Sequence, residues 1–177
     1  MTQQLTLNIN NILEYPIISR IRRNHGLEHA TLHILANYLP HTMLAGHSDM
    51  GGFWLIGDVP SETLHVAVQE AITRLRAGEN SLAIHPNCGT NYATMGSLAG
   101  LAGAVAMLGS GMRLRDKLNR LPFAAVLATL SLFISKPLGL LLQKRVTTSG
   151  SPGSLEIIMI THRKQGRVTV HRIQTRG

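Results

Sequence analysis

Residues 92–112, YATMGSLAGLAGAVAMLGSGM, form a run of 21 residues without a charged side chain. As a helix this run would extend about 30 Å, close to the thickness of the hydrocarbon core of a bilayer. Gly96, Gly100 and Gly103 would each weaken a helix in water by about 1 kcal/mol. In a bilayer the same small residues let a second helix approach closely. The run therefore predicts a membrane helix. Its three glycines could contact a partner membrane protein or a second copy of the chain. The alternative is a buried helix in a soluble core.

A second apolar stretch follows after the charged segment RLRDKLNR at 113–120, which predicts a loop. This stretch covers residues 121–143 and is interrupted by Lys136 and Pro137. Lys136 could extend its ammonium group to the membrane interface, and Pro137 could kink the helix. The two stretches together predict a helical hairpin whose second arm is either spanning or re-entrant.

Composition agrees with a membrane-associated protein, because only 15% of the residues are charged while 44% are hydrophobic; soluble domains have nearer a quarter charged. Residues 1–91 hold five Lys/Arg against seven Asp/Glu, whereas residues 144–177 hold seven against one. Such a basic tail suits anionic lipid headgroups or simply solubility. It lacks aromatic residues for stacking bases and any known nucleic-acid-binding motif, so no nucleic-acid partner is expected. A single cysteine excludes an intramolecular disulfide.

The expected fold class is α+β, in three parts. Residues 1–91 are predicted to form a small metal-binding α/β domain, residues 92–143 the membrane hairpin, and residues 144–177 a basic tail with a short β-hairpin. The first 20 residues lack a basic start followed by an apolar run, so no secretory signal is expected.

Local patterns predict the elements of the first and third parts. Helical spacing predicts a helix over 17–38 that stops before Pro40, and a second helix over 61–78 with Ser61 as N-cap and Gly78 as C-cap. The other expected elements are a hairpin of MLAGHS and FWLIG, a short strand at 81–85, a linker at 147–154, and a closing hairpin of LEIIMI and RVTVHRI.

The stretch NHGLEHATLH at 24–33 carries the first candidate site. His25 and His29 are four residues apart, so on a helix they share one face with Cβ atoms about 6 Å apart. Two neutral imidazoles so placed can both bind zinc through bonds of about 2.0–2.1 Å. Glu28 beside them could take a proton from water that the metal activates, and the order His-x-x-Glu-His is an inverted zinc-protease motif. The alternative is a polar helix face with solvated histidines.

The stretch IHPNCGT at 84–90 supplies a second group of ligand types. His85 and Cys88 lie three residues apart across a proline and before a glycine, a pattern typical of zinc-binding turns. Zinc sites use His and Cys, and catalytic ones commonly have three protein ligands and water. His25, His29 and Cys88 would supply three ligands. His85 would then be either a fourth ligand that closes a structural site or a residue that orients the others.

Several neighbouring residues could support these ligands. His33 continues the histidine face by one turn and could orient a ligand, although a surface position is the ordinary interpretation. Thr90 and Asn91 could hydrogen-bond near the site or cap the following helix. His47 and Asp49 lie near a turn, where hydrogen bonding to the backbone is the ordinary interpretation; they are reserve ligands in case Cys88 does not bind. The remaining histidines, predicted at the surface, are His41, His65, His162 and His171.

Together, HGLEHAT at 25–31 and HPNCGT at 85–90 resemble the two motifs HGAEHKT and HPRCGTS of the YqhQ-like family of uncharacterised bacterial membrane proteins, predicted metal-dependent enzymes. The matching positions are His25, Gly26, Glu28, His29, Thr31, His85, Pro86, Cys88, Gly89 and Thr90. The resemblance implies a metal site and an apolar membrane segment directly after the second motif. Leu27, Ala30 and Asn87 depart from the family pattern, and the segment between the motifs is longer here.

These observations predict a membrane-anchored zinc-dependent hydrolase, with peptidase activity as one form, and with zinc or another divalent metal as cofactor. The first alternative is a non-catalytic assembly or accessory protein with a structural zinc site, and the second is a membrane scaffold without metal. The expected location is the bacterial inner membrane. Basic residues on both sides of the hairpin nearly balance under the positive-inside rule, and the reduced lone cysteine favours a cytoplasmic metal domain.

Overall fold

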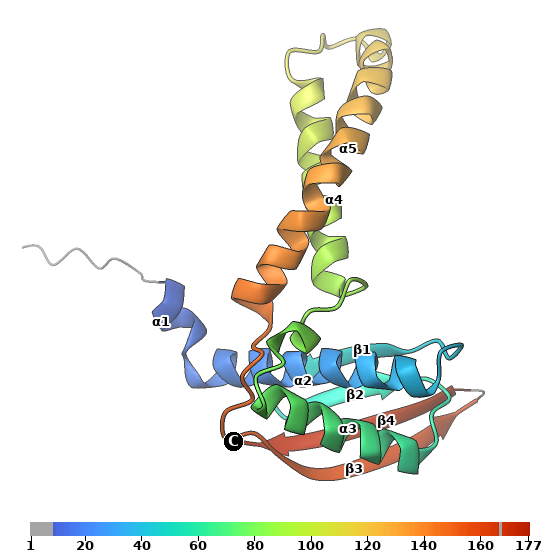
Figure 1. Cartoon of the computed structure of the whole chain (residues 1–177). Helices are drawn as coiled ribbons and strands as arrows, with labels where there is room; N and C mark the ends of the chain where they lie inside the picture. The colour runs from blue at the N-terminus through green and yellow to red at the C-terminus, as the bar shows by residue number, and fades with distance from the viewer. Residues whose placement is uncertain (1–8, 167) are drawn as a thin grey trace, which may run out of the picture. The chain divides into compact units, whose positions relative to one another are not determined.

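The computed structural model describes residues 9–166 and 168–177 and confirms an α+β chain, with helices and a four-stranded antiparallel sheet (Figure 1). The chain divides into two compact units. The first consists of residues 1–85 together with residues 144–177, and the second consists of residues 86–143. The C-terminal β-hairpin therefore shares a unit with the N-terminal segment, and each unit is described by itself.

The sheet of the first unit has the strand order β1-β2-β4-β3, and every neighbouring pair is antiparallel. Its strands are β1 (Ala45–Asp49), β2 (Gly52–Ile56), β3 (Glu156–Gln165) and β4 (Val168–Arg176). Both predicted hairpins are confirmed. The two hairpins are joined by pairing between β2 and β4, which are far apart in the sequence: Trp54 of β2 pairs with Arg172 of β4. The C-terminal hairpin thus completes the sheet that the N-terminal hairpin begins.

Two helices, α2 (Pro16–Tyr38) and α3 (Ser61–Arg76), pack on one face of this sheet (Figure 1). The hydrophobic core lies between these helices and the sheet, where Phe53, Leu55 and Ile173 of the strands are fully buried. Each such side chain contributes about 1.5–3 kcal/mol to stability. The predicted apolar face of α3 (Leu64, Val68, Ala71 and Leu75) is also buried. A short helix α1 (Ile9–Leu13) precedes α2.

The α3 boundaries differ in detail from the prediction. Pro60 is the N-cap and Ser61 is the first helical residue, without a side-chain cap. The hydroxyl of Ser61 instead lies 3.1 Å from Nδ1 of His162. At the other end Ala77 is the C-cap, and Gly78 follows with a φ of 95°, a conformation that favours glycine.

The predicted strand at 81–85 is wrong. Residues Asn80–Ala83 form a 3-10 helix, η1, which packs against α2. The carbonyls of Ala83 and Ile84 accept hydrogen bonds from ring nitrogens of His29 and His33. Because these carbonyls accept hydrogen bonds from side chains of α2, they do not pair with the backbone of a neighbouring strand.

Residues 147–151, called the strap below, were predicted to be part of a linker, yet they are held firmly against α2. The Ser149 N–H donates to the Arg22 carbonyl at 2.9 Å, and Nη2 of Arg22 donates to the Thr148 carbonyl at 3.3 Å. Gly26 makes this approach possible, because a Cβ there would overlap the carbonyl oxygen of Ser149. A glycine of the histidine motif is therefore required by packing.

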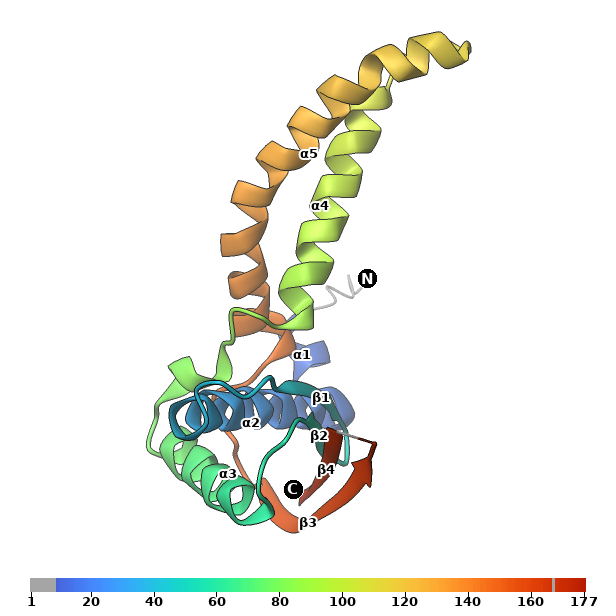
Figure 2. The ribbon, with the colours of Figure 1, turned by 90° about the vertical axis from the view of Figure 1, so that its right-hand side faces the viewer.

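The second unit is a helical hairpin of α4 (Gly89–Met107) and α5 (Leu114–Leu142), which pack along each other (Figure 2). A π-helical turn, η2 (Gln143–Thr147), follows. The predicted loop at 113–120 is wrong: α5 begins at Leu114 and continues through Pro122 and Pro137. The turn comes earlier, where Gly109 adopts a φ of 71°. Each proline removes one backbone hydrogen bond without ending the helix.

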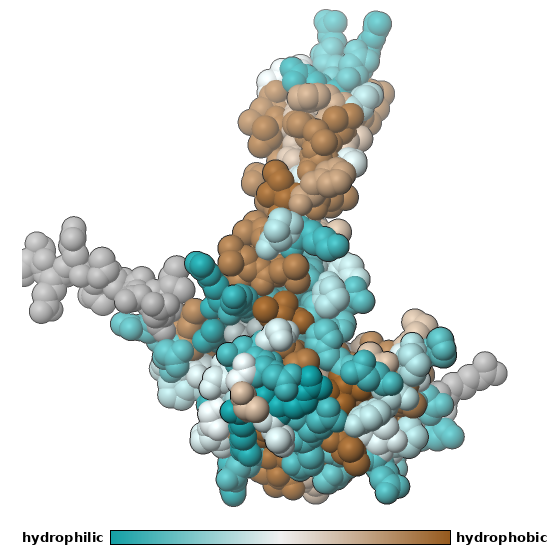
Figure 3. Space-filling model, in the orientation of Figure 1, coloured by the Kyte–Doolittle hydropathy of each residue, from teal (hydrophilic) through white to brown (hydrophobic). Residues whose placement is uncertain are grey.

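One described helix, Leu114–Thr147, is long and apolar enough to cross a membrane, and only 11% of its apolar window is buried. Apolar residues cover much of the surface of the hairpin in Figure 3. A Cβ at Gly96, Gly100 or Gly103 would meet no atom within 4 Å. These glycines therefore do not serve the contact between α4 and α5.

Candidate metal centre

The histidine motif lies in the most buried part of α2. Leu27 and Ala30 are fully buried in the hydrophobic core and fix the rotation of the helix about its axis. His25 and His29 consequently lie on one side, with ring centroids 4.4 Å apart. His29 is only 2% exposed. The predicted helix pair is therefore formed, and the alternative of solvated histidines does not hold for His29.

Backbone carbonyls fix the tautomers of both rings. Nδ1 of His29 lies 2.8 Å from the carbonyl oxygen of Ala83, and Nδ1 of His25 lies 2.9 Å from that of Thr147. A carbonyl oxygen can only accept, so Nδ1 carries the proton in each ring and Nε2 carries the lone pair. Metal-binding histidines commonly show this arrangement, which orients the ring and sets the ligating nitrogen.

Cys88 completes a group of three ligand types. One ligand atom from each of His25, His29 and Cys88 lies within 4.8 Å of the other two. Tetrahedral zinc with bonds of about 2.0–2.3 Å holds its ligand atoms roughly 3.5 Å apart. Modest side-chain rotations would bring all three atoms to one ion. The residues present thus fit a divalent metal of the zinc type.

The position of Cys88 suits an anionic ligand. Cys88 is the N-cap of α4, and its sulfur accepts a hydrogen bond from the Thr90 N–H at 3.4 Å. The partial positive charge at the N-terminal end of a helix stabilises a thiolate, the form that binds metal. Cys88 is 6% exposed.

Glu28 precedes His29 in the sequence and is buried, with 4% of its surface exposed, but it is not among the three residues whose ligand atoms lie within 4.8 Å of one another. The carboxyl group occupies the space above Gly46 of β1, where a Cβ would overlap Oε1 of Glu28. Gly46 therefore has a role that the sequence did not reveal: it leaves room for the carboxylate between α2 and the sheet.

His33 and His85 form the outer part of the cluster. Nε2 of His33 lies 2.9 Å from the Ile84 carbonyl, so its proton is on Nε2 and its lone pair on Nδ1, the reverse of His25 and His29. The His85 ring lies 4.9 Å from that of His33 and 5.7 Å from that of His29. Burial, and secondly the His33 ring, lower the pKa of His85 and favour its neutral form.

Polar residues at the base of the second unit hold the turn that carries Cys88. Nδ2 of Asn91 donates to the Pro86 carbonyl at 2.7 Å, and Oδ1 of Asn91 accepts from Nε2 of Gln143 at 2.7 Å. Gly139 allows this packing, since a Cβ there would lie 2.5 Å from Oδ1 of Asn91. Asn91 and Thr90 were predicted near the site; Gln143 and Gly139 were not.

The reserve ligands lie on β1 and are engaged differently. Asp49 accepts two hydrogen bonds of 2.8 Å from the Arg172 guanidinium, which lowers the pKa of Asp49. Arg172 also lies over the Trp54 ring, 4.8 Å from its centroid. His47 is exposed in the strand position opposite Trp54. Neither His47 nor Asp49 belongs to the group of three that could hold a metal.

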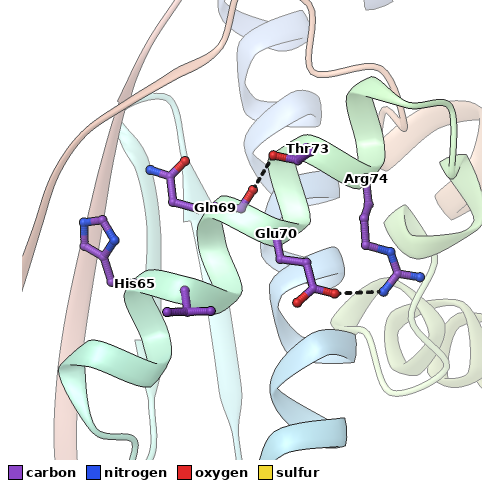
Figure 4. A pocket seen from close by; sticks show the side chains of 6 residues that line it. His65, Gln69, Glu70, Thr73 and Arg74 are labelled. Atoms are coloured by element: carbon purple, nitrogen blue, oxygen red, sulfur yellow. Dashed lines mark hydrogen bonds and ion pairs between the residues drawn. The ribbon is translucent and has the colours of Figure 1, made fainter.

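Three of the four remaining histidines, His41, His65 and His162, are exposed as predicted. His65 lines a shallow hollow on α3 in which Glu70 pairs with Arg74 rather than with a histidine (Figure 4). The prediction for His171 is wrong, because its side chain is fully buried. The strand period contained the signal: His171 lies two residues from the buried Ile173, on the same face of β4.

A comparison with known families identifies the chain. The domain of unknown function DUF6391 matches residues 20–160, which include both motifs and the helical hairpin. The chain belongs to this family. An uncharacterized protein of Picosynechococcus sp. is 39% identical to it over 139 residues. This match covers 73% of the chain and 66% of the relative. No solved structure matches. The family model found is DUF6391, not the YqhQ-like family, whose likeness rests on the two motifs.

Proposed function

We propose that this DUF6391 protein is a membrane-anchored, metal-dependent hydrolase, with zinc as the metal and an amide or peptide bond as the substrate. The observation that carries the proposal is the fixed pair His25 and His29 with Cys88 within 4.8 Å. Three protein ligands leave one position of a tetrahedral ion for water, the arrangement of catalytic rather than structural zinc.

Each residue has a definite part in this reaction. His25, His29 and Cys88 would hold the ion, which would supply a Lewis acid. Glu28, next to the ligand pair, takes a proton from the attacking water while the oxygen of that water bonds to the substrate carbonyl carbon. The C–N bond then breaks, and Glu28 returns the proton to the leaving nitrogen. His85, held neutral by burial, orients the substrate or a ligand.

The membrane anchor in this proposal is the hairpin of α4 and α5. Its support is the apolar, largely exposed span Leu114–Thr147 and the charge-free run at 92–112. Membrane lipids are then partners, and Gly96, Gly100 and Gly103 provide a surface for a second copy or another membrane protein. The proposed location is the bacterial inner membrane with the metal centre on the cytoplasmic side. The resemblance to the YqhQ-like motifs supports the same scheme.

One observation favours a second candidate, a structural zinc site in an accessory protein. The His85 ring lies 5.7 Å from that of His29, so a change of its rotamer could bring a fourth ligand to the ion. Four protein ligands close the site to water.

Cobalt substitution separates the two candidates. Protein purified in neutral detergent would be loaded with Co²⁺ and titrated with acetohydroxamate, which binds an open coordination position. A hydrolase should show a changed visible spectrum and a retained thiolate-to-cobalt band, lost in Cys88→Ser. An unchanged spectrum would favour the closed structural site, and absence of stoichiometric metal would reject both.

Activity is tested with the matched variant Glu28→Gln. Hydrolysis of fluorescein-labelled casein by the zinc-loaded protein should fall by about 10²–10⁴-fold, the usual contribution of a general base. Metal content should stay at the wild-type level. Equal hydrolysis by the wild type and Glu28→Gln would remove Glu28 from the reaction.

A further inference from the structure

A hollow of about 470 Å³ lies in the first unit at the start of α2 and shares no residue with the metal centre. Two arginines, Arg20 and Arg23, line it from the helix. They are three residues apart, so their side chains leave the same side of α2. The other lining residues are Glu14, Pro16, Ile17, Ser19, Met50 and Gly177.

Neither arginine has a carboxylate partner among residues 9–166 and 168–177. Nη2 of Arg20 donates to the Thr175 carbonyl at 2.8 Å, but its buried Nε has no hydrogen-bond acceptor in this described part of the chain. Arg23 reaches the Ser19 carbonyl and Oγ of Ser154 only at 3.4 Å. Their positive charges are therefore met only by backbone carbonyls and a hydroxyl, which leaves both guanidinium groups without a counter-charge among the described residues.

Other arginines of the same unit show the contrast. Arg74, Arg172 and Arg176 each pair with a carboxylate at 2.6–3.3 Å. Arg22, between the two arginines of the hollow, lies 3.6 Å from Glu14 and also donates to the strap, although its own buried Nε has no acceptor in the described part of the chain either. The guanidinium groups of Arg20 and Arg23 therefore lie in the hollow without a carboxylate partner. Glu14, the acidic side chain that lines the hollow, already pairs with Arg22.

The rim of the hollow is apolar. Ile17 and Met50 are 50% and 59% exposed although they are large hydrophobic residues. A ligand that combines an anionic phosphate group with an apolar part would satisfy both features. Guanidinium groups bind phosphate oxygens in pairs of parallel hydrogen bonds and remain charged at any physiological pH.

We propose that this hollow is a binding site for a phosphate group, held by Arg20 and Arg23, on a molecule that also has an apolar portion. A phospholipid headgroup and a soluble phosphate ester share this chemistry. The site is independent of the proposed hydrolase activity, because none of its residues belongs to the metal centre.

The test uses full-length protein in neutral detergent. One arm titrates inorganic phosphate by calorimetry, and the other detects retained phosphatidylglycerol or phosphatidylcholine by native mass spectrometry. Arg20→Gln/Arg23→Gln is the binding variant, and Arg163→Gln, an exposed arginine at the β3–β4 end, is the matched control. Arg23→Gln alone provides a second variant if the double variant does not fold.

We expect the double variant to bind at least tenfold more weakly and Arg23→Gln several-fold more weakly, with Arg163→Gln unchanged. Glu14→Gln should tighten binding several-fold, because it removes a negative charge beside the anion; a purely structural role for the arginines would not produce this effect. Retention of phosphatidylglycerol without a response to phosphate identifies a lipid source, and the reverse identifies a soluble ester. Binding of neither probe, or equal loss in Arg163→Gln, overturns the proposal.

Discussion

Two pairs of histidines in the first unit show what distinguishes a ligand pair from a mere contact. The rings of His25 and His29 are 4.4 Å apart on α2, and those of His162 and His171 are 5.9 Å apart on paired strands. In the first pair a carbonyl fixes each Nδ1 at 2.8–2.9 Å. The second pair has no such arrangement: His162 is exposed beside the Ser61 hydroxyl, and neither His171 nitrogen makes a hydrogen bond of normal geometry within residues 9–166 and 168–177.

Proximity is common to both pairs, so the feature that supports a metal site in the first pair is the shared orientation of its two rings. The carbonyls choose one tautomer in His25 and His29 and so present the same nitrogen from both rings. His171 is instead an apolar-face residue of the sheet. Burial, and then His162, lower its pKa, and the Val59 backbone partly offsets them.

Removal of a ligand should produce the largest effect. His29→Ala should weaken Co²⁺ or Zn²⁺ binding by at least about 100-fold, because it leaves two protein ligands. The matched variant His162→Ala should bind metal as the wild type does. Competition titration with a chromogenic chelator measures both. Similar affinity in the two variants would mean that the α2 pair is no more a ligand pair than the sheet pair.

Displacement of Glu28 should lower activity while it spares the metal. In Gly46→Ala the new methyl group overlaps Oε1 of Glu28, so the carboxylate must move. Hydrolysis of labelled casein should fall by about 10²-fold with metal content unchanged. Gln69→Ala is the control, because Gln69 is exposed on α3 and belongs to neither the metal centre nor the hairpin. A fully active Gly46→Ala protein would argue against Glu28 as the base.

Crowding between α2 and the strap should reduce stability. The methyl group of Gly26→Ala would overlap the Ser149 carbonyl, and overpacking of this kind costs about 1–3 kcal/mol. Trp54, the single tryptophan, lies in the sheet of this unit and reports its unfolding by fluorescence. The control Gln69→Ala, at an exposed position of α3 in the same unit, should keep the wild-type midpoint. An unshifted midpoint in Gly26→Ala would show that the strap yields without cost.

Titration of His171 should have the smallest effect. Its folded pKa is lowered, so below pH of about 6.5 the unfolded chain binds a proton that the folded chain does not. The free energy of unfolding should therefore fall as the pH decreases below 6.5, with a limiting slope of about 1.4 kcal/mol per pH unit. His171→Gln should flatten this dependence in urea titrations at pH 7 and pH 5.5. If the free energy of unfolding of His171→Gln depended as steeply on pH as that of the wild type, other titratable groups would cause the dependence.

The features that the sequence predicted are those encoded locally. Helical spacing before Pro40 marked α2, and alternation around turn residues marked both hairpins. The ligand types of the candidate site were also visible, because His25 and His29 are brought together by one helix. Cys88 needed a second motif, recognised through its spacing from His85.

The features that the sequence did not predict depend on distant partners. The carbonyls of Ala83 and Thr147 could not be singled out, because every residue offers one. Pairing of β2 with β4 joins residues about 120 positions apart, for which no local pattern exists. The charged segment at 113–120 looked like a loop, yet it is largely helical, since helix α5 accommodates its charges on an exposed surface.

The two carbonyls that orient the ligand pair have a consequence for biosynthesis. The partner of His29 is 54 residues further along the chain, whereas the partner of His25 is 122 residues further. During translation His29 can be oriented before the helical hairpin is made, but His25 must wait until both arms and η2 have left the ribosome. At roughly 5–20 residues per second, several seconds separate the two events. At the proposed metal site, the pair is therefore complete only at a late stage, after synthesis of the hairpin.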